Sequence, residues 1–499
     1  MHITNMFQID NLKLWNQFLY NPEEPLIFSS GLFLFLFTGF MLVYFILHKH
    51  HRAKTTFVTL FSLYFYYKSS GLYFTILIGS TLVDYTLANL IYKLKNQLYK
   101  KTILIISVIL NLGLLAYFKY TNFFYEIICN FSNYKFQPLD IFLPVGVSFF
   151  TFQSLSYTFD IYRGTLKPVK NVLDYAFFVS FFPQLVAGPI VRASEFIPQL
   201  FKPVIVTKEM IGKAVFLIGS GLIKKAIIAD YISVNFVDRI FDNPTLYSGL
   251  ENLAGVYGYA IQIYCDFSGY SDMAIGIALL MGFHFNINFD SSYQSINITE
   301  FWRRWHISLS TWLKDYVYIT MGGNKKGKIR TYVNLFLTML IGGLWHGAGF
   351  RFIIWGAMHG IVLILHKLWM IIFPKQKENN KFKWLKNSIS WLITFNFICF
   401  CWIFFRSENM KIASEVLSQI CLHFKPSIFF EFIQGYHEVL IIILIGYIIH
   451  FTPKKWELSI ENSIIKSPLL LKVVYLLFII LIVAQFKSAE IQPFIYFQF

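Results

Sequence analysis

The sequence predicts an all-α integral membrane protein with about 11 transmembrane helices, and three observations support this class. Of the 499 residues, 56% are hydrophobic, and the mean hydropathy is +0.54. Only 14% are charged, whereas a soluble domain carries about 25%. Long apolar runs alternate with short clusters of Lys and Arg, as in helices that cross a membrane repeatedly. The net charge of +16 therefore reflects cytoplasmic loops, and no nucleic-acid partner is expected.

The first third of the chain predicts an N-terminus outside the cytoplasm. Residues 1–24 carry Leu12, Trp15 and Leu19 at helical spacing and are expected to form an interfacial segment. The basic cluster at 48–54 is assigned to a solvated cytoplasmic loop because Lys and Arg collect on that side. The remaining elements are spans at 28–47, 56–67, 72–91 and 102–118, a cytoplasmic loop at 93–101 and an external segment at 119–140.

Basic loops later in the chain continue the alternation. Loops at 325–330 and 375–386 are predicted to be cytoplasmic, so the apolar runs between them form a hairpin that enters and leaves from that side. The predicted spans are 331–346, 352–370, 388–405, 437–452 and 469–486. This organisation gives a multi-spanning domain at 25–485, a catalytic core at about 140–370 and a C-terminal tail at 486–499.

The turn of that hairpin carries His346, beside Trp345 and four glycines in GGLWHGAG (342–349). A helix over 331–345 would be roughly 22 Å long, while the hydrocarbon layer is about 30 Å thick. His346 is therefore expected inside the membrane, where an ionisable side chain is costly and usually functional. A packed histidine in a helix hairpin is the alternative.

A second polar cluster lies in FWRRWHISLS (301–310). Its residue types suit a membrane-surface helix. They also suit a site in which Arg303, Arg304 and Lys314 bind an anionic donor while His306 faces the reaction. Two neighbouring arginines would keep His306 neutral, as a base requires.

Four further charged residues lie within apolar helices. Asp160 and Arg163, at i and i+3, are expected to pair on one helix face. Asp266 and Asp272 point about 240° apart on a helix, so each is expected to bind a neighbouring helix as part of the scaffold. The prolines in FPQLVAGP (182–189) predict a broken helix beside a cavity.

The sequence lacks the motifs of several common enzyme classes. GxSxG, Walker and HExxH patterns do not occur, which excludes the corresponding hydrolase, ATPase and zinc-protease classes. The five cysteines show no metal-ligand spacing and are interpreted as small apolar fillers, so neither a metal nor a bound cofactor is expected.

Five long stretches, in order, resemble the membrane-bound O-acyltransferase superfamily, and within it the bacterial branch that contains the alginate O-acetyltransferase membrane component. The resemblance covers roughly residues 25–485. The stretches are FLPVGVSFFTFQSLSYTFDIYRG (142–164), FFPQLVAGPIVRASEFIPQL (181–200), IYCDFSGYSDMAIGIALLMGF (263–283), NITEFWRRWHISLSTWLKDYVYI (297–319) and GGLWHGAGFRFIIWGAMHG (342–360).

The resemblance implies a multi-pass protein of the bacterial inner membrane with a central reaction chamber. The family's near-invariant histidine matches His346, and its second histidine matches His306; Trp305 and Trp345 beside them are candidate substrate contacts. No catalytic role is carried over to His359. The implied activity moves acetyl from a cytoplasmic donor, acetyl-CoA, to an extracytoplasmic partner protein that modifies a polysaccharide such as alginate.

Three alternatives stay open. The D-alanyl transferase branch for teichoic acids shares several of these stretches, and lipid acyltransferases belong to the same superfamily. A transporter for a polymer or lipid-linked sugar would also contain intramembrane charges and broken helices. The additional C-terminal spans favour the acetyltransferase branch over the D-alanyl transferase branch, and the sequence shows no inverted repeat of the kind expected for a transporter.

Overall fold

The computed structural model describes residues 15–373, 382–486 and 494–495. Residues 1–14, most of the tail at 486–499 and part of the loop at 375–386 lie outside this description, so the interfacial helix expected at Leu12 and the tail as a unit stay predictions. Throughout the described part, regular structure is helical and contains no strand, which confirms the all-α class.

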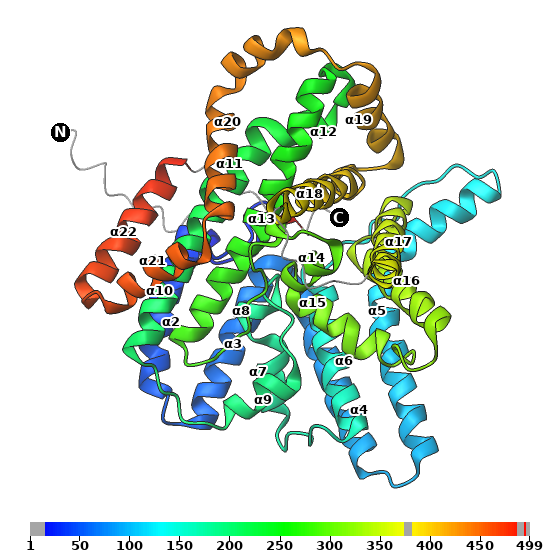
Figure 1. Ribbon diagram of the computed structural model, residues 1–499. Coiled ribbons are helices and arrows are strands. Elements are labelled where there is room, and N and C mark those ends of the chain that lie inside the picture. Colours follow the sequence, from blue (N-terminus) through cyan, green and yellow to red (C-terminus); the bar gives the residue numbers. More distant parts are fainter. Residues whose placement is uncertain (1–14, 374–381, 487–493, 496–499) are drawn as a thin grey trace.

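The N-terminal helices stand side by side and form one half of the bundle (Figure 1). The three spans predicted at 28–47, 56–67 and 72–91 are helical to within about five residues of their predicted bounds. The helices of this half are α2 (Gly31–Leu47), α3 (His51–Ser70), α4 (Phe74–Lys93), α5 (Gln97–Phe131), α6 (Val147–Arg163), α7 (Val172–Ser180), α8 (Phe182–Leu185) and α9 (Ala193–Leu200).

The C-terminal half surrounds the long helix α13, which runs through the middle of the molecule (Figure 1). The main helices are α10 (Lys208–Leu222), α11 (Asp230–Ile232), α12 (Asp238–Asp242), α13 (Gly249–Leu280), α14 (Ile298–Arg304), α15 (Ile307–Trp312), α16 (Lys328–His346), α17 (Phe350–Ile372), α18 (Lys383–Arg406), α19 (Met410–Leu422), α20 (Phe429–Phe451), α21 (Lys454–Lys466) and α22 (Leu469–Phe486). π-Helical turns at η3 (Ile223–Ala229), η4 (Ser233–Val237) and η7 (Leu313–Tyr318) interrupt the regular helices.

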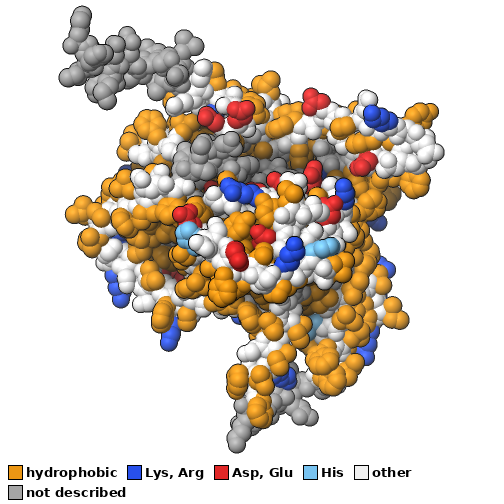
Figure 2. All heavy atoms as spheres, turned by 90° about the horizontal axis from the view of Figure 1, so that it is seen from above, with side chains coloured by type: hydrophobic (Ala, Val, Ile, Leu, Met, Phe, Trp, Pro, Cys, Tyr) orange, Lys and Arg blue, Asp and Glu red, His pale blue; other side chains and the backbone are white. Residues whose placement is uncertain are grey.

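Within the described ranges, six helical segments are long and apolar enough to cross a membrane. They cover α3 with α4, then α5, α17, α18, α20 and α22, and the shorter α2 is apolar as well. Seen from above, hydrophobic side chains cover the flanks of the molecule and charged ones gather toward the middle of this face (Figure 2). The exact number of spans, about 11 from the hydropathy pattern, stays a prediction.

Helix α13 forms the centre of the core because it can touch its neighbours at backbone distance. Its start is fixed by a capping box, in which Ser248 and Glu251 each bind the other's backbone N–H. Farther along, a Cβ placed on Gly221 of α10 would lie 2.5 Å from the carbonyl oxygen of Gly269. Only glycine permits this approach, so α10 and α13 pack without a layer of side chains between them.

The expected hairpin of α16 and α17 is present. A Cβ on Gly343 would lie 2.3 Å from the carbonyl oxygen of Phe352, and one on Gly356 would lie 2.6 Å from that of Met339. The glycines around the turn thus let the two helices close against each other, and His346 ends the first of them. The helix break expected at 182–189 is also found, after the short α8.

Several local expectations were wrong. Helix α5 does not end at residue 118 but continues to Phe131, because polar residues alone do not stop a helix. Helix α3 begins at His51 and Lys54 is buried, so the cluster at 48–54 is only partly a solvated loop. Cys421 is exposed, whereas the other four cysteines are buried fillers.

The pairing of Asp160 with Arg163 was also wrong, because both side chains find partners at or beside η7. The Tyr316 hydroxyl donates to Asp160 Oδ1 at 2.9 Å. Arg163 Nη2 donates to the Thr320 hydroxyl and to the Asp315 carbonyl at 2.9 and 3.1 Å. These contacts fix α6 against the segment that follows α15.

Candidate active site

His346 is the last residue of α16 and lies in an aromatic enclosure. The chain leaves the helix in an extended conformation at Gly347, and the imidazole is 3% exposed. Its ring centroid lies 5.0 Å from those of Trp345 and Trp355 and 5.1 Å from that of Phe405. Aromatic walls of this kind exclude water, which would otherwise hydrolyse an activated acyl group.

Lys119 and Tyr120 of α5 hold the end of α16 in place. The Lys119 ammonium donates to the carbonyl oxygens of Trp345 and His346 at 2.7 and 2.6 Å. The Tyr120 hydroxyl donates to the Leu344 carbonyl. The last carbonyls of a helix lack partners within the helix, and a cation there also complements the helix dipole. The sequence interpretation missed both residues because it placed them in an external segment.

His306 lies between α14 and α15 in a backbone conformation that non-glycine residues rarely adopt, with φ 41° and ψ 56°. Its side chain is fully buried, 4.6 Å from Phe267 and 6.1 Å from Trp345 between ring centroids. Burial lowers the pKa of the His306 imidazole and so favours the neutral ring. The cause is burial rather than the two neighbouring arginines that the sequence analysis invoked. Such strain is typical of functional positions.

His359 of α17 is a third buried histidine in this region, although the sequence interpretation assigned it no role. Its ring lies 4.6 Å from that of Trp355, which also contacts His346. Trp345 likewise contacts both His306 and His346. The three histidines therefore form one cluster, separated only by tryptophan rings.

The three cations predicted to bind the donor, Arg303, Arg304 and Lys314, have acidic partners or lie exposed on the surface. Arg304 forms an ion pair with Glu300 at 2.7 Å, and Lys314 lies 3.5 Å from Asp315 with 59% of its side chain exposed. Arg303 is exposed on α14. Trp305 is buried and shares a contact with Phe289, whose ring also lies 6.2 Å from that of His306. Trp305 thus contacts His306 indirectly, through the Phe289 ring.

Asp266 and Asp272 anchor α13 to the chain after α10, as predicted. Lys225 Nζ lies 2.5 Å from Asp266 Oδ1, and Lys224 Nζ lies 2.7 Å from Asp272 Oδ2. Asp266 also accepts a hydrogen bond from the backbone N–H of Ile495 at 2.9 Å.

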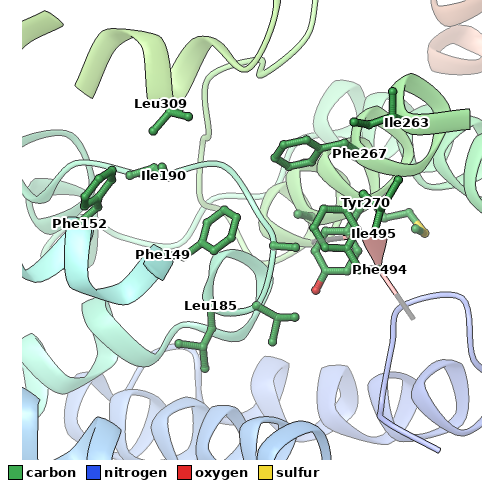
Figure 3. Packing of buried hydrophobic residues seen from close by; sticks show 14 of the residues in the cluster. Phe149, Phe152, Leu185, Ile190, Ile263, Phe267, Tyr270, Leu309, Phe494 and Ile495 are labelled. Carbon is green, nitrogen blue, oxygen red and sulfur yellow. The ribbon is translucent and has the colours of Figure 1, made fainter. Parts of the chain in front are cut away.

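The C-terminal residues Phe494 and Ile495 reach this part of the core (Figure 3). The Phe494 ring lies 5.2 Å from Phe267 and 5.3 Å from Tyr270 between centroids. Phe267 in turn stands against His306. Only the Phe267 ring therefore separates Phe494 from His306.

A pocket of about 240 Å³ opens beside the end of α16. Lys119 and Trp345 form part of its wall, so it reaches the backbone that carries His346. The other lining residues are Tyr20, Pro22, Pro25, Ser69 and residues 142–149. Within the described ranges, no group of three or more His, Cys, Asp or Glu residues is arranged to hold a metal ion.

Apolar helices that enclose a water-excluding cluster of histidines define a membrane protein with a buried reaction site. Comparison with known proteins identifies the class further. The model of the membrane-bound O-acyltransferase family matches residues 168–407.

Individual relatives agree with the family model. The chain is 41% identical over 428 residues to the peptidoglycan O-acetyltransferase of Helicobacter pylori, covering 79% of each chain. It is 40% identical over 398 residues to the probable alginate O-acetylase AlgI of Pseudomonas aeruginosa, covering 78% of this chain and 73% of the relative. It is 30% identical over 289 residues to the teichoic acid D-alanyltransferase of Bacillus subtilis, covering 54% and 70%. The chain belongs to the membrane-bound O-acyltransferase family and is a membrane-embedded O-acyltransferase.

Proposed function

We propose that this enzyme transfers an acetyl group from acetyl-CoA, bound on the cytoplasmic side of the bacterial inner membrane, to an extracytoplasmic hydroxyl destined for a cell-surface polysaccharide. The observation that carries the proposal is the position of His346, buried among aromatic rings at the end of a helix that Lys119 and Tyr120 clamp. The peptidoglycan and alginate acetyltransferases among the relatives support acetyl as the transferred group.

In the proposed reaction His346 acts as the general base. The hydroxyl oxygen of the acceptor attacks the carbonyl carbon of the acetyl thioester while its proton moves to the imidazole. The tetrahedral intermediate then collapses, the C–S bond breaks, and the thiolate takes the proton from the imidazolium. The products are an acetyl ester and free coenzyme A. The aromatic walls protect the thioester from water during these steps.

We further propose that a separate extracytoplasmic protein receives the acetyl group before the polymer does. The pocket beside Trp345 and Lys119 is small, at about 240 Å³, and it offers room for one hydroxyl-bearing group rather than for a stretch of polymer. On the predicted topology it opens on the outer side, which places a partner or small carrier over its mouth.

Reconstitution tests both parts of this proposal. The purified chain is placed in vesicles with labelled acetyl-CoA on the cytoplasmic-facing side and polymer alone on the other, with and without the partner protein. Transfer to polymer that requires the added protein supports the relay. Efficient acetylation of the polymer without it would show that this chain completes the reaction itself, and absence of any acetyl transfer would contradict the function.

The teichoic acid D-alanyltransferase relative favours one alternative, in which D-alanine replaces acetyl. Its match covers 54% of the chain, against 79% for the peptidoglycan O-acetyltransferase. Supplying labelled acetyl and labelled D-alanyl donors to the same membranes separates the two, because only the true acyl group should reach an extracytoplasmic product.

A further inference from the structure

His306 and His359 lie near His346, and the Nδ1 atoms of these two histidines have different kinds of hydrogen-bond partner. His306 Nδ1 lies 3.2 Å from Asn288 Oδ1. His359 Nδ1 lies 3.3 Å from Nε1 of Trp302. A neutral imidazole carries its proton on one nitrogen and a lone pair on the other, so the partner of the first nitrogen decides what the second can do.

The Asn288 atom that faces His306 is identified as oxygen by its other neighbours. The backbone N–H of Ser308, which can only donate, lies 3.1 Å from this atom. The amide nitrogen on the other side of Asn288 donates to the Ser271 hydroxyl at 3.1 Å. The Ser308 hydroxyl lies 3.4 Å from the same His306 nitrogen, but it donates its hydrogen to Asn288 Oδ1 at 2.9 Å. Because a carbonyl oxygen only accepts, neutral His306 carries its proton on Nδ1 and its lone pair on Nε2.

His359 has the opposite arrangement. Indole Nε1 of Trp302 carries a hydrogen and has no acceptor capacity, so His359 Nδ1 must be the acceptor. The proton of neutral His359 is therefore on Nε2.

Both Nε2 atoms are buried and have no hydrogen-bond partner among the described residues. His306 and His359 are themselves fully buried. A buried polar atom without a partner is costly, and an active site that gains its partner from a substrate is a recognised reason for one.

We infer that Asn288 and Trp302 hold His306 and His359 in opposite tautomers, so that His306 presents a hydrogen-bond acceptor and His359 a donor on the two sides of the catalytic site. The inference rests on the proposed acyl transfer for its chemical meaning. His306 accepts a hydrogen bond on the side where the acceptor hydroxyl gives up its hydrogen to His346. His359 donates to the carbonyl oxygen, on which negative charge develops in the tetrahedral intermediate.

Asn288 is built into the fold as a positioning residue. Its carbonyl oxygen accepts from the backbone N–H of Ile307 at 2.9 Å, and its side-chain oxygen also accepts from the Ser308 hydroxyl at 2.9 Å. These bonds fix the first turn of α15, which holds the strained backbone of His306. Trp302 acts in the same way from α14, since its ring stands 5.1 Å from that of His359.

Nitrogen-15 NMR of histidine-labelled protein tests the tautomers without any substrate, so its outcome is independent of the proposed reaction. The His306 and His359 signals are assigned by their loss in His306→Gln and His359→Gln. We expect a proton on Nδ1 of His306 and on Nε2 of His359. The reverse assignment at either residue would overturn the inference even if acetyl transfer is confirmed.

Substitutions of Asn288 and Trp302 then test whether the two tautomers affect the turnover number of the enzyme. Asn288→Ala and Trp302→Phe should mix the tautomers and lower kcat by about 10²-fold, the lower end of proton-transfer effects, with little change in KM. Asn288→Asp keeps the acceptor oxygen and should retain the tautomer and most of the activity. Asn286→Ala is the matched control, because Asn286 bonds Glu195 away from the histidines. Unchanged tautomers and unchanged kcat in both Asn288→Ala and Trp302→Phe would refute the positioning role.

Discussion

Two buried polar regions of this enzyme show how differently a membrane protein can use charge. Around Lys225 opposite charges lie together, since the one ammonium lies 2.5 Å from Asp266 and 2.8 Å from Asp230. Around His346 the two neighbouring histidines, His306 and His359, have Nε2 atoms that lack hydrogen-bond partners within the described residues.

This difference distinguishes residues that stabilise the fold from residues that can react. A buried charge that is already paired has no free capacity to bind a substrate, and removing its partner lowers the stability of the protein. A buried imidazole with an unused nitrogen is poorly stabilised by the protein and gains its interaction only when a reactant arrives. The Lys225 region is thus expected to govern folding, and the histidine cluster is expected to govern turnover.

The largest effect should come from His346→Ala, which is expected to lower acetyl transfer by about 10²–10⁴-fold, the usual contribution of a positioned base. Protein amount and elution profile in detergent should stay normal because the change removes no buried charge pair. His437, an exposed histidine on α20, provides the control through His437→Ala. Near-normal product acetylation by a well-expressed His346→Ala enzyme would remove His346 from the mechanism.

In the Lys225 region the effect should appear in stability. Lys225→Met leaves Asp230 and Asp266 buried without their cation and should cost about 3–5 kcal/mol. Thermal unfolding in detergent, followed by fluorescence-detected chromatography, measures the loss. Lys213→Met is the comparison, since its 3.6 Å pair with Glu461 is 47% exposed at the lysine and should contribute at most about 1 kcal/mol. Equal stability of the two variants would break the proposed distinction.

His306→Ala should impair transfer less than His346→Ala, by about 10²-fold. The side chain is fully buried beside Trp345, but its proposed task is to assist rather than to take the proton alone. Steady-state kinetics with purified components provide the measurement. If turnover does not change, the reaction must be assigned to His346 and His359 without it.

The smallest effect is expected from cysteines that report topology. In a background without the exposed Cys421, the changes Lys49→Cys, Lys95→Cys, Lys326→Cys and Lys383→Cys should leave activity unchanged and resist an impermeant thiol reagent added to intact cells. Their loops carry the excess of Lys and Arg that marks the cytoplasmic side. Ser132→Cys, on the expected outer side, should react. Labelling of two or more cytoplasmic positions would invert the arrangement.

The helices were predictable because hydropathy is a local property of the chain. The hairpin of α16 and α17 lies close to its predicted bounds, and the depth of His346 followed from its distance along an apolar run. The pairing of Asp266 and Asp272 with separate partners also followed, from their angular separation on one helix. Each of these features depends on neighbouring residues only.

The rest of the site joins residues far apart in the sequence. Lys119 reaches a carbonyl 227 residues away, and Trp302 reaches His359 across 57 residues. A single sequence contains no measure of such distances. One clue was present, since Lys119 interrupts an otherwise apolar run, and a lysine within a membrane helix is a functional candidate by default.

The hydrogen bonds from Lys119 connect α5 directly to the end of α16. This helix has 35 residues and is therefore roughly 52 Å long, and it grips the end of α16 about two-thirds of the way along. Its last dozen residues extend beyond the grip toward Phe131 and the exposed Ser132. Because Lys119 and Tyr120 bind the carbonyl oxygens that end α16, any displacement of α5 at these residues also moves the backbone that carries His346.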